Sequence, residues 1–520
     1  MTVQTFDWTA DTHMPLRART SVRREWLAIF AFLLAIAFAL RGWEFGNPIK
    51  GLDEQYYLLV GDRIWAGAIP YVDLWDRKPF GLFALFAGIR LLRGTGIVQA
   101  QIVATLFATV TALIVTHIAR RSTARTPAIL GGVTYLIGLH VLWGGNTQTP
   151  VFYNMFIAGA AWILLDTAPG LDRRGDLPRA LGAMLLAGLA IQIKTNAVFE
   201  GGFLGAWALW RMHRAGTPLP RLVRTAALLA LAGLLPTLAV MAGYVAIGHF
   251  PEWWFANAQS QLLKHGTSGP AWLRLRETIA LSAPIVLIVL IGLWRMTDRF
   301  RSWTQHAAFL AGWATICVVD ALAIGGYWAH YMLPLVVPAA ILSASAFATS
   351  RYGLLGFAIF AAYPVTDATL LDHIAASDER THVAATLTAI PDDVMRECMF
   401  VYQGPVIYYH LKHACTVTRF AFSDHLRSAA EADALGEDAA TALRAALARR
   451  PGVILDIEHS TWEEPNRRND AILRAELRRN YIPIARLPQD HRLSGTEWLI
   501  VWRRSDLAAQ DRRRILVRQL

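Results

Sequence analysis

The sequence predicts a polytopic α-helical membrane protein with about 11 transmembrane helices and a small C-terminal soluble α/β domain. Two observations lead to this fold class. Apolar runs recur through residues 26–365, and residues 366–520 alternate between strand and helix patterns. The composition agrees, because a chain that is 54% hydrophobic with 19 Trp and a mean hydropathy of +0.34 fits a membrane region joined to a soluble domain.

The spans are predicted from apolar runs long enough to cross about 30 Å of hydrocarbon, which only helices or closed barrels can do. The pair at 180–211 is short for two full spans, so the number of spans carries a margin of about one or two. The runs lie near residues 26–43, 97–118, 127–143, 151–166, 180–197, 199–211, 225–248, 280–295, 307–325, 330–349 and 352–365.

Charge predicts the orientation of the spans. Residues 1–364 hold 29 Lys and Arg against 17 Asp and Glu, whereas residues 365–520 hold 21 against 22. The positive charge therefore belongs to the membrane region and does not indicate nucleic-acid binding. Arginines cluster before the first span and in every second loop, which marks these segments as cytoplasmic; the clusters include Arg120/Arg121/Arg125, Arg211/Arg214 and Arg295/Arg299/Arg301.

The domain boundaries follow from this topology. We expect a multi-pass protein of the cell inner (plasma) membrane with a cytoplasmic basic tail at 1–25 and a membrane domain at 26–365. The first helix is expected to be retained, because no small-residue cleavage site follows it before Arg41. The first outer loop covers 44–96, and residues 366–520 form an extracytoplasmic (periplasmic) domain.

The order of patterns in this domain predicts an α/β fold. Strands are expected at 398–403, 415–419, 452–457, 481–487 and 498–504, and helices at 375–390, 405–412, 424–449 and 464–480. Cys398 and Cys415 open two of the strand patterns. A disulfide between neighbouring strands and a pair of buried free thiols fit the sequence equally.

The first outer loop holds six acids between Glu44 and Asp76, beside a membrane span. Asp53–Ala66 and Phe80–Leu92 predict two interfacial helices within it. Asp53 and Glu54 open the first helix, and two interpretations are open. Asp53 caps the helix while Glu54 favours its positive end, or one carboxylate is a general base in a cavity at the membrane surface.

Basic and aromatic residues near the outer surface are the other candidates. Arg77 and Lys78 either snorkel at the interface, or Lys78 binds a phosphate at the height of lipid headgroups. His330 and Tyr331 stand at the outer end of two later spans. An ionisable group there is either structurally paired or functional.

Several motifs in order resemble the membrane-embedded glycosyltransferases of the GT-C superfamily. They are GLDEQYYLL, AIPYVDLWDRKPFGLF, GNTQTPVFYNMF, IQIKTNAVFE and GGYWAHYMLPLVVP, which lie within residues 25–350. The resemblance is strongest to the branch that contains protein O-mannosyltransferases and the lipid A aminoarabinose transferase. It implies a GT-C type fold, a polyprenyl-phosphate sugar donor and transfer with inversion outside the cytoplasm.

The resemblance also implies roles for particular residues. Asp53 matches the catalytic residue, with Glu54 beside it, and Lys78 matches the ligand of the lipid phosphate. Binding of the lipid phosphate or the sugar is further expected from Arg63, Arg77, Tyr57, His330 and Tyr331. The chain departs from the family where Asn146, Thr147, Gln148 and Thr149 replace an acid of the second outer loop, and where Tyr56 and Tyr57 replace an arginine.

We therefore expect a hexosyl- or pentosyl-type glycosyltransferase in contact with membrane lipids, whose acceptor is a protein, a lipid or a glycan. No cofactor is required, and the sequence has no metal-ligand spacing to support a divalent metal. The alternative is a transporter or flippase of lipid-linked saccharide intermediates, for which repeated halves and midplane charges would be typical. A binding or sensory protein would leave the acidic first loop unexplained.

Overall fold

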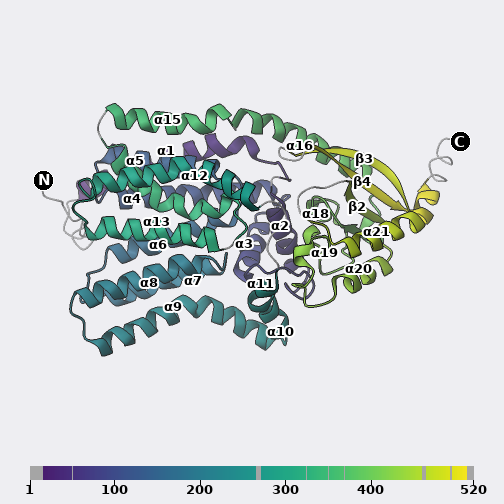
Figure 1. The fold of residues 1–520 in the computed structure, drawn as a ribbon, viewed down its shortest axis with the longest axis horizontal. Helices are drawn as coiled ribbons and strands as arrows, with labels where there is room; N and C mark the ends of the chain where they lie inside the picture. Colours follow the sequence, from purple (N-terminus) through teal and green to yellow (C-terminus); the bar gives the residue numbers. More distant parts are fainter. Residues whose placement is uncertain are drawn as a thin grey trace. The chain divides into compact units, whose positions relative to one another are not determined.

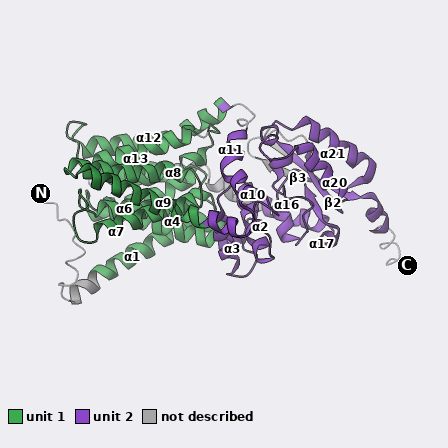
Figure 2. Ribbon diagram, turned by 90° about the horizontal axis from the view of Figure 1, so that it is seen from below, with its two compact units in different colours: residues 1–45, 101–239, 272–371 green, residues 46–100, 240–271, 372–520 purple. Residues whose placement is uncertain are grey.

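The structure is a computed structural model (Figure 1). It describes residues 16–49, 51–264, 271–323, 325–348, 351–367, 369–458, 464–491 and 495–511. Residues 1–15 of the predicted basic tail lie outside these ranges, and the first helix begins at Leu16. The chain forms two compact units (Figure 2): unit 1 comprises residues 1–45, 101–239 and 272–371, and unit 2 comprises residues 46–100, 240–271 and 372–520.

Within the described residues, each apolar run singled out in the sequence overlaps a helix. The helices are α1 (Leu16–Arg41), α4 (Ile97–Ala119), α5 (Arg125–Val141), α6 (Thr149–Leu165), α7 (Asp176–Ile191), α8 (Ala197–Arg214), α9 (Leu219–Ala246), α12 (Ala271–Met296), α13 (Gln305–Ala323), η4 (Ala329–Leu335) with α14 (Val336–Ala346), and α15 (Arg351–Asp367). Among the described residues, six segments are long and apolar enough to cross a membrane. The multi-pass helical fold is confirmed, and eleven spans stays a prediction.

The segment η4–α14 is the most buried of these six, because 89% of this apolar segment is buried inside the structure. Helix α5 approaches α14 closely because Gly131 has no side chain; a Cβ there would lie 2.7 Å from the carbonyl oxygen of Ala340. Small residues allow membrane helices to pack in this way. The start of η4, which carries His330 and Tyr331, therefore precedes a firmly packed helix.

Unit 2 combines the first outer loop with the C-terminal residues. The loop contains α2 (Leu52–Trp65) and α3 (Phe80–Arg90), which confirms both predicted helices to within two residues. The two helices touch at Gly61, where a Cβ would lie 2.7 Å from the backbone of Phe86 and Ala87. Residues 240–271 add α10 (Phe250–Trp254), a π-helical turn (Phe255–Gln259) and α11 (Ser260–Leu263).

The C-terminal part of unit 2 contains the predicted small sheet. Its strands are β1 (Met399–Val401), β2 (Val453–Glu458), β3 (Tyr481–His491) and β4 (Gly495–Arg504), in the order β1-β2-β4-β3. β1 and β2 are parallel, and the other neighbours are antiparallel. The helices are α16 (Thr369–Ala389), α17 (Val394–Glu397), α18 (Ile407–Leu411), α19 (Ser423–Arg427), η5 (Ala429–Glu431), α20 (Ala439–Ala448) and α21 (Arg467–Asn480).

Two predicted elements were wrong. Residues 415–419 form a single bridge, Thr416 to Met399, because the carbonyl of Arg419 accepts from the Trp75 backbone N–H instead of joining the sheet. The helix predicted at 424–449 is broken into α19, η5 and α20. Gly436 has a φ of +78°, which favours glycine, and Asp438 then caps α20 by accepting from the Thr441 N–H.

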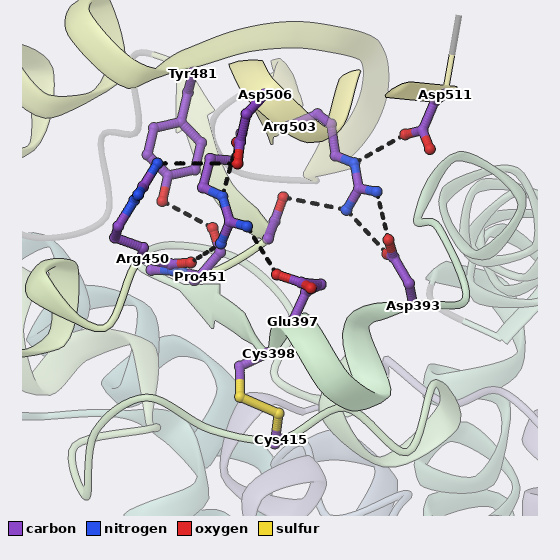
Figure 3. Close-up of polar contacts among 12 residues, drawn as sticks. Asp393, Glu397, Cys398, Cys415, Arg450, Pro451, Tyr481, Arg503, Asp506 and Asp511 are labelled. Atoms are coloured by element: carbon purple, nitrogen blue, oxygen red, sulfur yellow. Dashed lines mark hydrogen bonds and ion pairs between the residues drawn. A yellow bond between two sulfur atoms is a disulfide. The ribbon is translucent and has the colours of Figure 1, made fainter. Parts of the chain in front are cut away.

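A disulfide joins Cys398 and Cys415 beside this sheet (Figure 3). Of the two alternatives that fit the sequence, a disulfide and a pair of free thiols, the structure therefore has the disulfide. Next to it, the buried guanidinium of Arg503 on β4 is held by Asp393 at 2.6 Å and Asp511 at 3.1 Å. Arg504 pairs with Glu397 at 2.8 Å, so an ion pair links the C-terminal end of β4 to the C-terminal end of α17.

The core of this region includes one residue of the first outer loop. Trp75 is 1% exposed and packs in a cluster with Phe400, Phe420, Leu443 and Ile454. Burial of an aromatic side chain of this size dominates local energetics. Trp75 thereby anchors the chain immediately before Asp76, Arg77 and Lys78.

Candidate active site

Helix α2 begins after Gly51, which is its N-cap and has a φ of +97°, a conformation that favours glycine. Asp53 is therefore in the first turn and is not the cap, contrary to one of the two interpretations. Glu54 is 6% exposed and folds back over Gly51, where a Cβ would lie 2.1 Å from its Oε2. A carboxylate at this position is favourable because the helix N-terminus carries partial positive charge.

Asp53 lies between two donors. Its Oδ2 accepts from the Tyr57 hydroxyl at 3.1 Å and from the Lys78 Nζ at 3.2 Å. Tyr57 reaches Asp53 because residues four apart lie on one face of a helix, whereas Lys78 comes from the segment that leads into α3. The Asp53 side chain is 39% exposed and that of Lys78 is 28% exposed, so both can meet a ligand.

Two buried tyrosines hold the segment that carries Lys78. The Tyr56 hydroxyl donates to the carbonyl of Trp75 at 2.9 Å, and the Tyr71 hydroxyl donates to the carbonyl of Lys78 itself at 2.9 Å. Burial raises the pKa of Tyr56 and Tyr71 well above the ordinary value. Both phenols stay protonated and remain donors, which fixes the backbone of Lys78 next to α2.

Asp76 is a second carboxyl group in this segment. It is 7% exposed and accepts from the Arg77 backbone N–H at 2.6 Å. Burial raises its pKa to about 6; Lys78 and Arg77 act in the opposite direction, and Asp53 adds to the rise. Asp76 thus changes its charge close to neutral pH beside Lys78.

Arg77 and Arg63, two further predicted phosphate ligands, have protein partners in the structure. Arg77 pairs with Glu431 at 2.5 Å, donates to the Ser260 hydroxyl at 3.2 Å and lies over the Trp75 ring. Arg63 donates to the carbonyl of Ala414 at 2.5 Å. These contacts join the first outer loop to the remainder of unit 2, and phosphate binding by either arginine stays a prediction.

The partners of Arg77 form a cluster that the sequence did not reveal. Glu431 also pairs with Lys264 at 2.7 Å. Burial opposes its ionisation, but Arg77 and Lys264 outweigh burial and lower the pKa of Glu431 to about 2. His425 lies against Trp75 at 4.7 Å between ring centroids, and burial lowers its pKa to about 3. No local pattern marks residues so distant in the sequence as partners.

His330 and Tyr331 belong to unit 1. Their rings are 4.7 Å apart, and the Lys194 Nζ lies 4.9 Å from the centre of the Tyr331 ring. The preceding turn is held by Thr278, whose hydroxyl donates to the carbonyl of Tyr327 at 2.6 Å. This group places the Lys194 ammonium over the face of the Tyr331 ring, a cation–π contact, and ligand binding by His330 and Tyr331 stays a prediction.

In the part of the chain that the structure describes, no group of three His, Cys, Asp or Glu residues is arranged to hold a metal ion. The groups that the structure brings together at Asp53 are one carboxylate, one ammonium group and one phenol. A carboxylate accepts a proton, and an ammonium group stabilises a developing phosphate anion.

Comparison with known proteins gives a family match and a shared fold. Residues 77–239 match the family model described as dolichyl-phosphate-mannose-protein mannosyltransferase. No curated protein matches the chain. ArnT from Cupriavidus metallidurans has a similar structure in its apo state, with a TM-score of 0.54, 16% identity, and coverage of 92% of this chain and 98% of ArnT.

The same ArnT bound to undecaprenyl phosphate gives a TM-score of 0.53 and 15% identity over the same shares of the two chains. AglB from Archaeoglobus fulgidus, an archaeal oligosaccharyltransferase, gives a TM-score of 0.47 and 10% identity over 83% of this chain and 69% of AglB. The fold shared with ArnT and the family-model match confirm the resemblance of this chain to the GT-C superfamily of membrane glycosyltransferases.

Proposed function

We propose that the protein transfers a hexosyl- or pentosyl-type sugar from a polyprenyl-phosphate donor to an acceptor hydroxyl on the outer face of the membrane. The observation that carries the proposal is the contact between Asp53 and Lys78, 3.2 Å apart on an outer-loop scaffold within an ArnT-like fold. The predicted inner-membrane orientation would place this loop on the extracytoplasmic side.

The Asp53–Lys78 pair can open at low cost. Partly exposed ion pairs contribute only about 0–1 kcal/mol, so a donor phosphate can take over the Lys78 ammonium group and release Asp53. The Arg77–Glu431 pair is buried, and breaking such a pair costs about 3–5 kcal/mol. This difference favours Lys78 over Arg77 as the cation that binds the phosphate.

The reaction needs one base and one cation. Asp53 takes the proton of the acceptor hydroxyl while the acceptor oxygen forms a bond to the anomeric carbon. The bond from that carbon to the phosphate oxygen breaks, and its electrons leave with the polyprenyl phosphate beside Lys78. A single displacement of this kind inverts the configuration of the sugar.

The remaining candidates have supporting roles in this scheme. Tyr57 orients Asp53 through its hydrogen bond, and Glu54 is a secondary candidate for the base. His330 and Tyr331 are proposed ligands of the donor. A phosphate monoester is already a good leaving group, so the scheme uses no cofactor and no general acid.

The test is to incubate the purified protein with a panel of polyprenyl-phosphate sugars and candidate acceptors, and to measure released polyprenyl phosphate. Acceptor-dependent release is the expected result. Movement of intact donor across a vesicle membrane without release would instead support the transporter alternative.

A further inference from the structure

Unit 1 contains a cavity of about 1020 Å³ that the proposed reaction does not use. It lies at the helix ends where the sequence places the cytoplasmic arginine clusters. Its lining includes three arginines from different segments, a histidine, a tryptophan and a threonine: Arg121, Arg211, Arg295, His306, Trp207 and Thr304.

The positive charge of this cavity is only partly neutralised. Arg121 pairs with Asp166. Arg211 donates to the backbone carbonyls of Leu164 at 2.9 Å and Thr167 at 2.6 Å, and in the described ranges neither it nor Arg295 forms a salt bridge. The described residues that line the cavity include three arginines and no Asp or Glu, which makes the cavity a favourable place for an anion.

Neutral donors in the cavity suit a phosphate. The Nε2 atom of His306 is buried and has no hydrogen-bond partner among the described residues. Helix α13 begins at Gln305, which lines the cavity, and Thr304 accepts from the Ala307 N–H at 3.1 Å as the helix starts. A helix N-terminus and arginine side chains are both common ligands of phosphate oxygens.

The surroundings indicate that the phosphate belongs to a lipid. On α12, Leu287 and Ile291 stand two turns and one turn before Arg295 on the same face, and they are 56% and 37% exposed. Trp294 and Trp303 are also exposed, as is typical of residues at a membrane interface. An acyl chain along this face would place its headgroup at Arg295.

We infer that the cavity binds the phosphate headgroup of an anionic phospholipid at the cytoplasmic surface. Basic pockets between transmembrane helices on that side are suited to such headgroups, and each basic residue contributes about 1 kcal/mol. The inference concerns a site of its own and does not depend on the identity of the sugar donor.

The experiment measures lipid binding to the purified full chain by native mass spectrometry. Phosphatidylglycerol is compared with phosphatidylcholine of the same acyl chains. Arg295→Gln should weaken phosphatidylglycerol binding about fivefold. Arg301→Gln removes the same charge from an exposed position nearby that does not line the cavity, and should leave binding unchanged.

Arg295→Lys keeps the charge and should restore most of the binding, which guards against a general folding defect in the glutamine variant. Equal binding of phosphatidylcholine, or equal losses in Arg295→Gln and Arg301→Gln, would overturn the inference. Competition by glycerol 3-phosphate at the lipid's own concentration would show that the site takes a soluble phosphate compound, which also overturns it.

Discussion

At the scale of single residues, the central feature is a carboxylate shared by Tyr57 and Lys78. Tyr57 is one helical turn from Asp53, and Lys78 is 25 positions away in the sequence, so the two donors depend on different parts of the loop. In the proposed reaction, the Tyr57 contact is kept when the donor phosphate takes over Lys78. Asp53 is then oriented by Tyr57 and open on the other side to an acceptor hydroxyl.

Replacing Lys78 by Gln should lower kcat/KM for the donor by about 10- to 150-fold, because charge-assisted hydrogen bonds contribute about 1.5–3 kcal/mol. Initial rates over a range of donor concentrations measure this effect. Lys412→Gln is the control, since Lys412 pairs with the highly exposed Asp392. A Lys78 variant with unchanged kcat/KM would show that another group binds the phosphate.

Asp76 predicts a pH dependence of donor binding. Its pKa of about 6 makes it neutral below that pH and negative above it, whereas a phosphodiester donor keeps its charge. The donor KM should rise about fivefold from pH 5 to pH 7, the effect of about 1 kcal/mol of repulsion. Asp76→Asn should abolish this rise.

The control for this profile is Asp456→Asn. Burial also raises the pKa of Asp456 to about 6, but this residue lies on β2 and pairs with Arg474. The inflection in KM should persist in this variant. If the rise in donor KM between pH 5 and pH 7 disappears in Asp456→Asn, or remains in Asp76→Asn, Asp76 is not the titrating group.

At the scale of elements, the site depends on how closely α2 and α3 pack. Asp53 is on α2, and Lys78 lies two residues before α3, so the approach of the two helices at Gly61 sets the separation of the charged groups. Backbone atoms of α3 cannot move aside as a flexible side chain would. A methyl group at position 61 therefore has to push the helices apart.

Gly61→Ala should destabilise the protein by about 1–3 kcal/mol, the usual cost of overpacking, and should reduce turnover. Gly88→Ala is a matched control, because Gly88 lies inside α3 with nothing within 4 Å of an added Cβ. That change should be neutral or stabilising by up to about 1 kcal/mol. Thermal unfolding in detergent compares the two, and equal melting temperatures would contradict the predicted contact.

At the scale of the whole molecule, the C-terminal residues take part in building the site. Trp75 is in their hydrophobic core, and Arg77 is paired with Glu431 from η5. Lys78 is thus preceded by three residues whose side chains are buried. The C-terminal residues support the position of Lys78, although none of their side chains is proposed to act on the donor.

Glu431→Gln should lower stability by about 3–5 kcal/mol, because it leaves the buried Arg77 without its counter-charge. The pKa of Glu431 falls from 4.5 to about 2 on folding. Its stabilising contribution is therefore complete above pH 4.5 and is lost as the pH falls from there towards 2. Acidification across this window should destabilise the unsubstituted protein more than the variant.

Glu437→Gln provides the comparison, since Glu437 forms a partly exposed pair with Arg419, and such a pair contributes at most about 1 kcal/mol. Melting temperatures between pH 7 and pH 3 check both variants. Equal effects of the two substitutions would show that the Arg77–Glu431 pair has no special structural role.

Local patterns in the sequence predicted much of this molecule. Apolar runs and turn signals are set by residues that are close together in the sequence. The helices of the membrane region and the two helices of the first outer loop could therefore be located from the sequence alone. The prediction of one helix over 424–449 was wrong because the Ala-rich sequence favours a helix throughout, whereas the chain leaves the helix after Arg427 and starts a new one after Asp438. The Arg77–Glu431 pair joins residues about 350 positions apart, and such tertiary contacts leave no periodic signal.

The most direct test of the account is the turnover of Asp53→Asn with its donor. Asparagine keeps an acceptor for Tyr57 but cannot take the acceptor proton, so turnover should fall by about 10²–10⁴-fold with little change in thermal stability or donor binding. Asp73→Asn, in the same loop, replaces an exposed acid that accepts from the Ile69 N–H and should keep its activity. Undiminished turnover in Asp53→Asn would contradict the assignment of Asp53 as the base.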